Sequence, residues 1–102
     1  MSDMTQAERR QKILAETAQI HWQELQPFFA KGQLIAVDAS LDLIDVALEI
    51  TDDNTAAIQH WMTQQFIGPV SETQAKDWLQ RDPSLWAVVI APWVLVQEKR
   101  PN

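Results

Sequence analysis

The chain has 102 residues, 46% of them apolar and 22% charged, which fits one globular domain with a core of its own. It contains no cysteine, which excludes disulfide scaffolds, cysteine zinc sites, iron–sulfur clusters and thiol catalysis. Fourteen acidic and eight basic side chains give a formal charge of −6, so nucleic acid repels the chain unless its cations cluster on one face. No signal-peptide core or membrane-spanning apolar run is present, and we expect a cytoplasmic protein.

The first third of the chain is predicted to be mostly helical. Thr5-Gln6-Ala7-Glu8 is a capping-box pattern that starts a helix after Thr5, and apolar side chains within residues 13–20 give this helix one buried side. A second helical stretch follows, in which Pro27 kinks or restarts the helix and Gly32 stands at its C-terminal end. The short apolar run at residues 34–38 then predicts a buried strand.

Acidic side chains interrupt the apolar helix that is predicted next. At about 100° per residue, Asp42, Asp45, Glu49 and Asp52 fall within an arc of about 80°. Burying several carboxylates together is costly without a cation, whereas exposing them costs nothing. We therefore expect this acidic stripe to face solvent. Metal binding is the alternative, because the i, i+4 spacing of Asp45 and Glu49 allows both to reach one ion.

A polar break at residues 51–54 is predicted to end this helix and to begin another. Thr51, Asp52 or Asp53 is the expected N-cap of the new helix. The opposite face is polar but carries no formal charge, whereas one face is apolar and consists of Ala57, Ile58, Trp61, Met62 and Phe66. The breaker pair Gly68-Pro69 stops it.

A last helix and a β-rich segment complete the chain. Residues 71–74 form a second capping-box pattern, which opens a helix that ends before Pro83. Residues 86–98 are strongly strand-like on both sides of Pro92. A two-residue hairpin at Ala91-Pro92 is disfavoured, because the favoured turns need a positive φ that proline lacks. We expect a bulged or bent strand, or a cis-proline turn.

The predicted fold is an α+β domain with a small two- or three-stranded sheet. Its order is helix, helix, strand, helix, turn, helix, helix and strand or strands, which is similar to a winged helix with one added helix. Residues 45–67 have the spacing of a helix-turn-helix, a pattern that indicates a fold rather than a function. We expect a single domain over residues 1–102, with flexible tails at residues 1–5 and 99–102.

The five tryptophans are too large for all to be buried easily in so small a domain. Trp22, Trp61 and Trp78 lie at apolar helical positions, and we expect them in the core. Trp86 and Trp93 flank the valine run, and one of them is expected to be exposed beside a strand edge, where tryptophan is a favoured contact residue.

No catalytic, cofactor or metal site is predicted. The two glycines are too few for a P-loop, a dinucleotide fingerprint or a nucleophile elbow. His21 and His60 stand alone, and no Glu-x-x-His motif exists. Asp38, at the end of a strand, is the best-placed carboxylate for acid–base work, although a helix cap is the simpler interpretation.

Two segments of the chain resemble a bacterial family of small proteins that contain a domain of unknown function. They are IHWQELQPFFAKGQLIAVDASLDLIDVALEI and IAPWVLVQE, and the resemblance covers nearly the whole length. It implies a bacterial single-domain protein with no assigned activity, cofactor or catalytic residue.

Our leading hypothesis is a non-enzymatic protein-interaction module that binds a protein partner or itself. Its candidate surface consists of the uncharged helix face and one exposed tryptophan, namely Gln59, His60, Thr63, Gln64 and Trp93.

Two alternatives remain open. The first is a winged-helix nucleic-acid binder with a basic face built from Arg9, Arg10, Lys12 and Lys99. The second is a metal-dependent enzyme that uses the acidic stripe.

Overall fold

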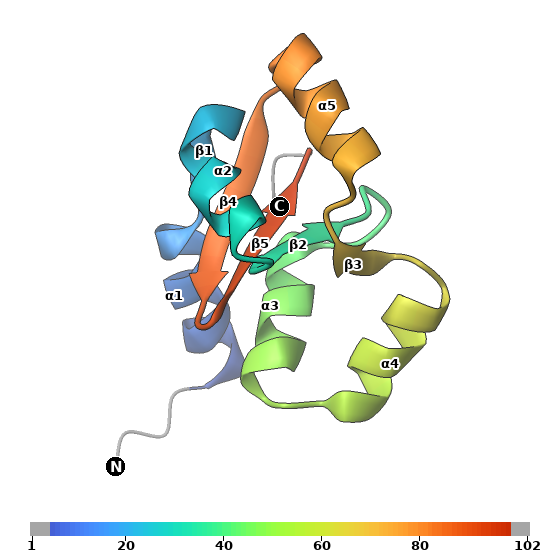
Figure 1. The fold of residues 1–102 in the computed structure, drawn as a ribbon. Helices are drawn as coiled ribbons and strands as arrows, with labels where there is room; N and C mark the ends of the chain where they lie inside the picture. The colour runs from blue at the N-terminus through green and yellow to red at the C-terminus, as the bar shows by residue number, and fades with distance from the viewer. Residues whose placement is uncertain (1–4, 99–102) are drawn as a thin grey trace.

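Ten helices and strands make up the part of the chain that the computed structural model describes, residues 5–98 (Figure 1). The helices are α1 (Gln6–Glu16), α2 (Trp22–Ala30), α3 (Leu43–Thr51), α4 (Thr55–Thr63) and α5 (Glu72–Arg81). The strands are β1 (Ala18–Ile20), β2 (Leu34–Val37), β3 (Ile67–Pro69), β4 (Leu85–Ile90) and β5 (Trp93–Gln97).

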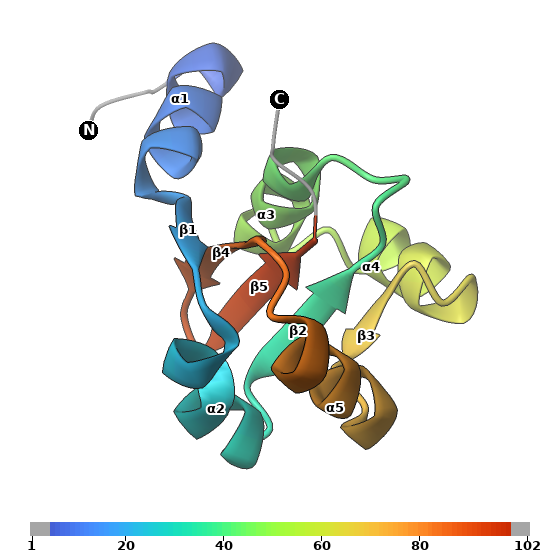
Figure 2. The same cartoon turned by 90° about the horizontal axis from the view of Figure 1, so that it is seen from above.

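The strands form one mixed sheet in the order β1-β4-β5-β2-β3. All neighbours are antiparallel except β2 and β5, which run parallel at the centre of the sheet. Helices cover both faces: α1, α3 and α4 lie on one side, and α2 and α5 on the other (Figure 2). The predicted α+β class is therefore confirmed.

Each face of the sheet has its own apolar core. Alternation along β5 shows the division, because Val94 and Val96 pack towards α2 and α5, whereas Leu95 between them packs towards α1 and α3. Trp22 and Trp78 dominate the first core, and the second is built mainly from the apolar side of α3.

The sheet is larger than the two or three strands that we predicted. The segment Ala18–Ile20 forms β1 and pairs with β4, although its residues continue a helical pattern. Ile67–Pro69 forms β3 beside β2, where the Gly-Pro pair indicated only a helix stop. These two strands interrupt the predicted winged-helix-like order. Three residues are too few to show the period-two alternation that identifies a strand.

The predicted starts of α1 and α5 are correct. Thr5 and Glu8 form the expected capping box of α1. At α5, Ser71 Oγ accepts a hydrogen bond from the Gln74 backbone N–H at 3.1 Å. The N-cap of α4 is Asn54 rather than Thr51, Asp52 or Asp53, and its side chain accepts from the Ala57 backbone N–H. The three predicted candidates lie one to three residues too early, because α3 continues to Thr51.

Several helices end on a residue in the left-handed conformation, and only one of these residues is a glycine. Gly32 follows α2 with φ +69°, as we predicted. Asp53 after α3, Gln65 after α4 and Asp82 after α5 have φ values of 55°, 63° and 47°. This conformation costs a non-glycine residue roughly 1–2 kcal/mol. These helix ends are therefore locally strained positions at which glycine fits better.

We expect Gln65→Gly to raise the free energy of unfolding by about 0.5–1 kcal/mol, because glycine removes the left-handed penalty but adds chain entropy to the unfolded state. The neighbouring Gln64 has φ −79° and serves as a matched control. We expect Gln64→Gly to lower the free energy of unfolding by about 0.5–1 kcal/mol. Urea unfolding of both variants measures the difference, and equal signs would contradict this account.

β4 and β5 form a hairpin around a cis peptide bond at Ala91-Pro92. Ile90 pairs with Trp93 across the ladder, so the connection contains two residues. A cis proline at the third position of a four-residue turn defines a type VI turn. The cis-proline turn is thus one of the geometries that we predicted, and it also forms the two-residue hairpin that we considered disfavoured.

The tryptophans divide by burial. Trp22 and Trp78 are each only 3% exposed, in agreement with their predicted core positions, whereas Trp61 and Trp86 are half-buried. Trp93 is the exposed one, at 39%. It does not lie beside a free strand edge, since β5 is paired on both sides.

Within residues 5–98 no helix combines the length and the apolar character needed to cross a membrane. The tails predicted at residues 1–5 and 99–102 lie outside the described residues, except Thr5, which caps α1.

Candidate functional site

Arginines of α1 cover the acidic stripe of α3. Arg10 pairs with both Asp42 and Asp45, and Arg9 pairs with Asp52. The side chains of these aspartates range in exposure from 21% for Asp42 to 60% for Asp45, so the pairs lie at the surface. The stripe therefore faces solvent, as we expected, and it also serves as the docking strip for α1, which we did not predict.

The remaining carboxylate of the stripe, Glu49, accepts a hydrogen bond from the side-chain amide of Asn54. In the described part of the chain, no three His, Asp or Glu side chains lie close enough together to hold a metal ion. Partial burial works to lower the pKa of Arg10, but its hydrogen bonds and charge attraction to Asp42 and Asp45 outweigh that effect and raise the pKa. The groups around the stripe therefore serve to attach one helix to another.

We expect Arg10→Gln to lower the free energy of unfolding by about 0.5–1 kcal/mol, because exposed ion pairs are weak even when one cation serves two anions. The double variant Arg10→Gln/Asp45→Asn should lose less stability than the sum of the two single variants, since both substitutions break the same pair. Urea unfolding at low and high salt measures the coupling. A coupling that does not shrink in salt would contradict an electrostatic attachment of α1.

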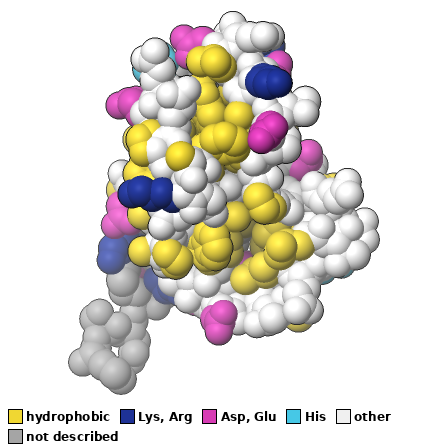
Figure 3. All heavy atoms as spheres, in the orientation of Figure 1, with side chains coloured by type: hydrophobic (Ala, Val, Ile, Leu, Met, Phe, Trp, Pro, Cys, Tyr) yellow, Lys and Arg dark blue, Asp and Glu magenta, His cyan; other side chains and the backbone are white. Residues whose placement is uncertain are grey.

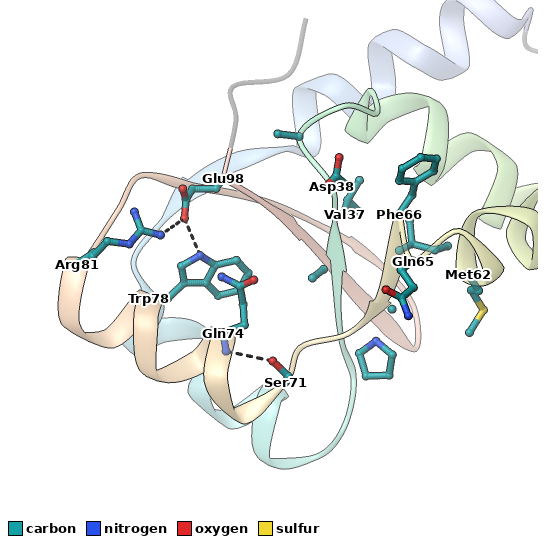
Figure 4. A pocket seen from close by; sticks show the side chains of 15 residues that line it. Val37, Asp38, Met62, Gln65, Phe66, Ser71, Gln74, Trp78, Arg81 and Glu98 are labelled. Atoms are coloured by element: carbon teal, nitrogen blue, oxygen red, sulfur yellow. Dashed lines mark hydrogen bonds and ion pairs between the residues drawn. The ribbon is translucent and has the colours of Figure 1, made fainter.

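A hollow of about 830 Å³ opens at the ends of the two central parallel strands (Figure 4). Asp38 follows β2 and Glu98 follows β5, and both line the hollow together with residues of β3 and α5. The carboxyl ends of parallel strands are common ligand sites in sheets covered by helices. The hollow is therefore the first place to look for chemistry.

The charged groups of this hollow are occupied by the protein itself. Glu98 accepts hydrogen bonds from the Trp78 indole at 2.8 Å and from Arg81 at 2.6 Å (Figure 4). Arg81 is also held by Asp77, and these hydrogen bonds lower the pKa of Asp77 and raise that of Arg81. This network connects α5 to the end of β5.

Asp38 has a structural role in the turn after β2. Its carboxylate accepts hydrogen bonds from the Ser40 hydroxyl and from the Ser40 backbone N–H, and these bonds lower the pKa of Asp38. It is not the cap of the following helix, because the N-cap of α3 is Asp42, which accepts from the Ile44 N–H at 2.9 Å. The carboxylate that the sequence offered for acid–base work thus stabilises a turn.

The same turn depends on Gln97, which sequence reasoning missed. Gln97 is only 1% exposed, and its Nε2 donates to the backbone carbonyls of Asp38 at 2.8 Å and Leu41 at 2.7 Å. Its Oε1 is buried and has no hydrogen-bond partner among the described residues. A glutamine at the polar end of an apolar strand gives no signal that it is buried.

A second hollow, of about 290 Å³, is an apolar groove between α4 and the sheet. Ile58 and Met62 of α4 form one wall, and Ile35, Pro69 and Trp93 lie on the sheet side. No residue of α4 is buried, and Met62 is 50% exposed. Figure 3 shows apolar side chains gathered over this part of the molecule. We call this face the α4 groove.

The structure brings only part of the predicted interaction surface to the α4 groove. Trp93 lines it, across from α4. Gln59, His60 and Thr63 on α4 and Gln64 at its C-cap are exposed but do not line the groove. Sequence reasoning missed Met62, which it assigned to the apolar face of a packed helix. Its half-exposure follows from the loose packing of α4, which the sequence does not show.

None of the nine residues that line the α4 groove is charged, and five of them lie in one stretch of the chain that has no formal charge. Residues 54–71 contain no Asp, Glu, Lys or Arg, although 22% of the whole chain is charged. This stretch includes all of α4 and β3. One face of the molecule therefore combines an apolar hollow, an exposed methionine, an exposed tryptophan and a stretch of chain without formal charge.

Comparisons with known proteins place the chain among relatives of unassigned activity. The profile of a family described as "Protein of unknown function (DUF2288)" matches residues 8–98. Among solved structures, the NMR solution structure of PA1075 from Pseudomonas aeruginosa is 48% identical in sequence, with a TM-score of 0.79. The similarity covers 97% of this chain and 91% of that one. No curated protein matches the chain.

Proposed function

This chain belongs to the DUF2288 family of proteins of unknown function, and we propose that it is a non-enzymatic protein-interaction module that docks its partner in the α4 groove. The observation that carries the proposal is the half-exposed pair Met62 and Trp93 on either side of an apolar hollow. Methionine and aromatic residues are enriched where proteins meet, and charged residues are depleted from the centre of such contacts. The face has this composition.

Docking in the groove would use side chains rather than strand addition. The Asp38 N–H donates to the Phe66 carbonyl, and the Val70 N–H donates to the Leu34 carbonyl. In β3 the backbone N–H and C=O groups of alternate residues, including Gly68, therefore point towards β2. The backbone groups of Ile67 and Pro69 then point away from β2 at the edge of the sheet, and proline has no N–H to donate. A proline on a short edge strand blocks the addition of a further strand.

The contacts of the basic residues argue against the nucleic-acid alternative. Arg9 and Arg10 are paired with aspartates of α3, so their charge is offset where they stand. Lys12 is exposed, and Lys99 lies outside the described residues. Phosphate binding needs cations that are free to replace counterions, and paired arginines lose that role.

Site-specific photo-cross-linking in living cells tests the proposal. A benzophenone amino acid in place of Met62 should give a covalent adduct with a protein, because the partner covers this position. The same amino acid in place of Leu79, which is 55% exposed on α5 across the sheet, is the matched control and should give none. Equal labelling at both positions, or no adduct at Met62, would contradict docking in the α4 groove.

A further inference from the structure

We infer that the partner in the α4 groove is a second copy of this chain, which forms a two-fold symmetric dimer. This inference rests on the proposed function and identifies the occupant of the same surface. It is carried by the distribution of charge, the shape of the face and the area that the face offers.

Charge limits where two copies can meet. Each chain carries a formal charge of −6, so two copies repel one another over most of their surfaces. Residues 54–71 are the longest stretch without formal charge, and their helix and strand supply five of the nine residues that line the groove. A foreign partner of an acidic protein is usually steered by opposite charge at the contact, and this face offers none.

The face also has both halves of a self-complementary contact. In a two-fold dimer the same patch serves both subunits, so a protruding group on one copy must meet a hollow on the other. Met62 and Trp93 line the α4 groove and are 50% and 39% exposed, and the groove itself is apolar. Each copy can therefore place the exposed side of Met62 against the hollow of its mate.

A stable dimer also needs enough surface at the contact. A stable interface of standard size buries about 800 Å² on each partner. The surface of the chain measures 6531 Å², so such a contact needs roughly one eighth of it. Residues 54–71 are about a sixth of the chain, and most of them are exposed.

Sedimentation equilibrium between about 1 and 100 µM tests the dimer in solution. The mass of the wild-type chain should rise towards twice 11.7 kDa. Higher salt should strengthen association, because it screens the repulsion between like-charged copies. Met62→Glu places two carboxylates in the contact and should weaken association at least about tenfold, whereas Met62→Leu should keep it. Leu79→Glu adds the same charge on the far side of the sheet and should leave the contact intact.

Each outcome decides the inference. A constant mass of 11.7 kDa over the whole range would overturn it, and so would a dimer that Met62→Glu leaves unchanged. The size of the cross-linked adduct at position 62 separates this inference from the proposed function. An adduct of twice the chain mass supports both, an adduct of another mass overturns only the dimer, and no adduct overturns both. Circular dichroism should show that Met62→Glu is folded, as expected for a half-exposed helix position.

Discussion

Gln97→Glu is expected to lower the free energy of unfolding by about 3–5 kcal/mol at neutral pH, the cost of leaving an unpaired charge in a protein interior. The glutamine is 1% exposed, and its amide donates to the carbonyls of Asp38 and Leu41. A carboxylate has no N–H to donate and places negative charge against both oxygens. Urea unfolding followed by circular dichroism measures the loss, and a loss greater than the total stability would leave the variant a poorly folded chain.

Gln97→Met separates charge from hydrogen bonding. Methionine has a similar shape and carries no charge, but it removes the amide donor from both carbonyls. The Asp38 carbonyl keeps the Leu41 backbone N–H as a donor at 3.0 Å, so the main loss is the hydrogen bond to the Leu41 carbonyl, which costs about 1–3 kcal/mol. We therefore expect this variant to lie between the wild-type protein and Gln97→Glu in stability. Equal losses for the two variants would show that the missing donor, and not the buried charge, governs this site.

Trp22→Ala should be the other strongly destabilising substitution, with a loss of about 3–5 kcal/mol in the free energy of unfolding. The indole is 3% exposed and lies 5.5 Å from the ring of Phe29 and 5.8 Å from that of Trp78. Its removal leaves a cavity between α2 and α5 that neighbouring rings fill only in part. Urea unfolding followed by circular dichroism avoids the fluorescence change caused by losing a tryptophan.

Trp93→Ala is the matched control, since it removes the same side chain from a surface position that is 39% exposed. We expect the free energy of unfolding to fall by only about 1 kcal/mol, because Trp93 buries less apolar area on folding than Trp22 does. If Trp93→Ala lowered the free energy of unfolding as much as Trp22→Ala does, Trp93 would belong to the core of the monomer. That result would contradict its proposed role in the α4 groove.

The helices could be predicted from the sequence because their signals are local. The capping box at Thr5 lies within a few residues of the helix start that it specifies, and Gly32 closes α2 at the expected place. β1 and β3 could not be predicted in this way. Each is three residues long, and each is a strand because a longer strand lies beside it, which is a tertiary cause.

The attachment of α1 to α3 was beyond sequence reasoning for a similar reason. Arg10 and Asp45 are 35 residues apart, and Arg9 and Asp52 are 43 apart. Nothing near an aspartate in the chain shows which distant arginine will meet it. The sequence correctly predicted that the acidic side chains share one side of α3, but the arginines that contact them are brought there by the fold.

The candidate site was predictable only in outline. The missing charge on the outer face of α4 and the exposure of one tryptophan could be predicted from the residue pattern, whereas the groove between them requires the position of α4 against the sheet. Met62 shows the difference. Its spacing places it on the apolar side of α4, yet a helix that packs loosely leaves that side half open to solvent.

The position of β5 has a consequence for biosynthesis. The last strand of the described chain to leave the ribosome is the middle strand of the sheet, and it joins the β1-β4 edge to the β2-β3 edge. Until it emerges, the nascent polypeptide carries two unjoined strand pairs and exposed apolar surface, which invite misassociation. A premature stop codon ahead of Trp93 would therefore remove the centre of the domain rather than trim its margin.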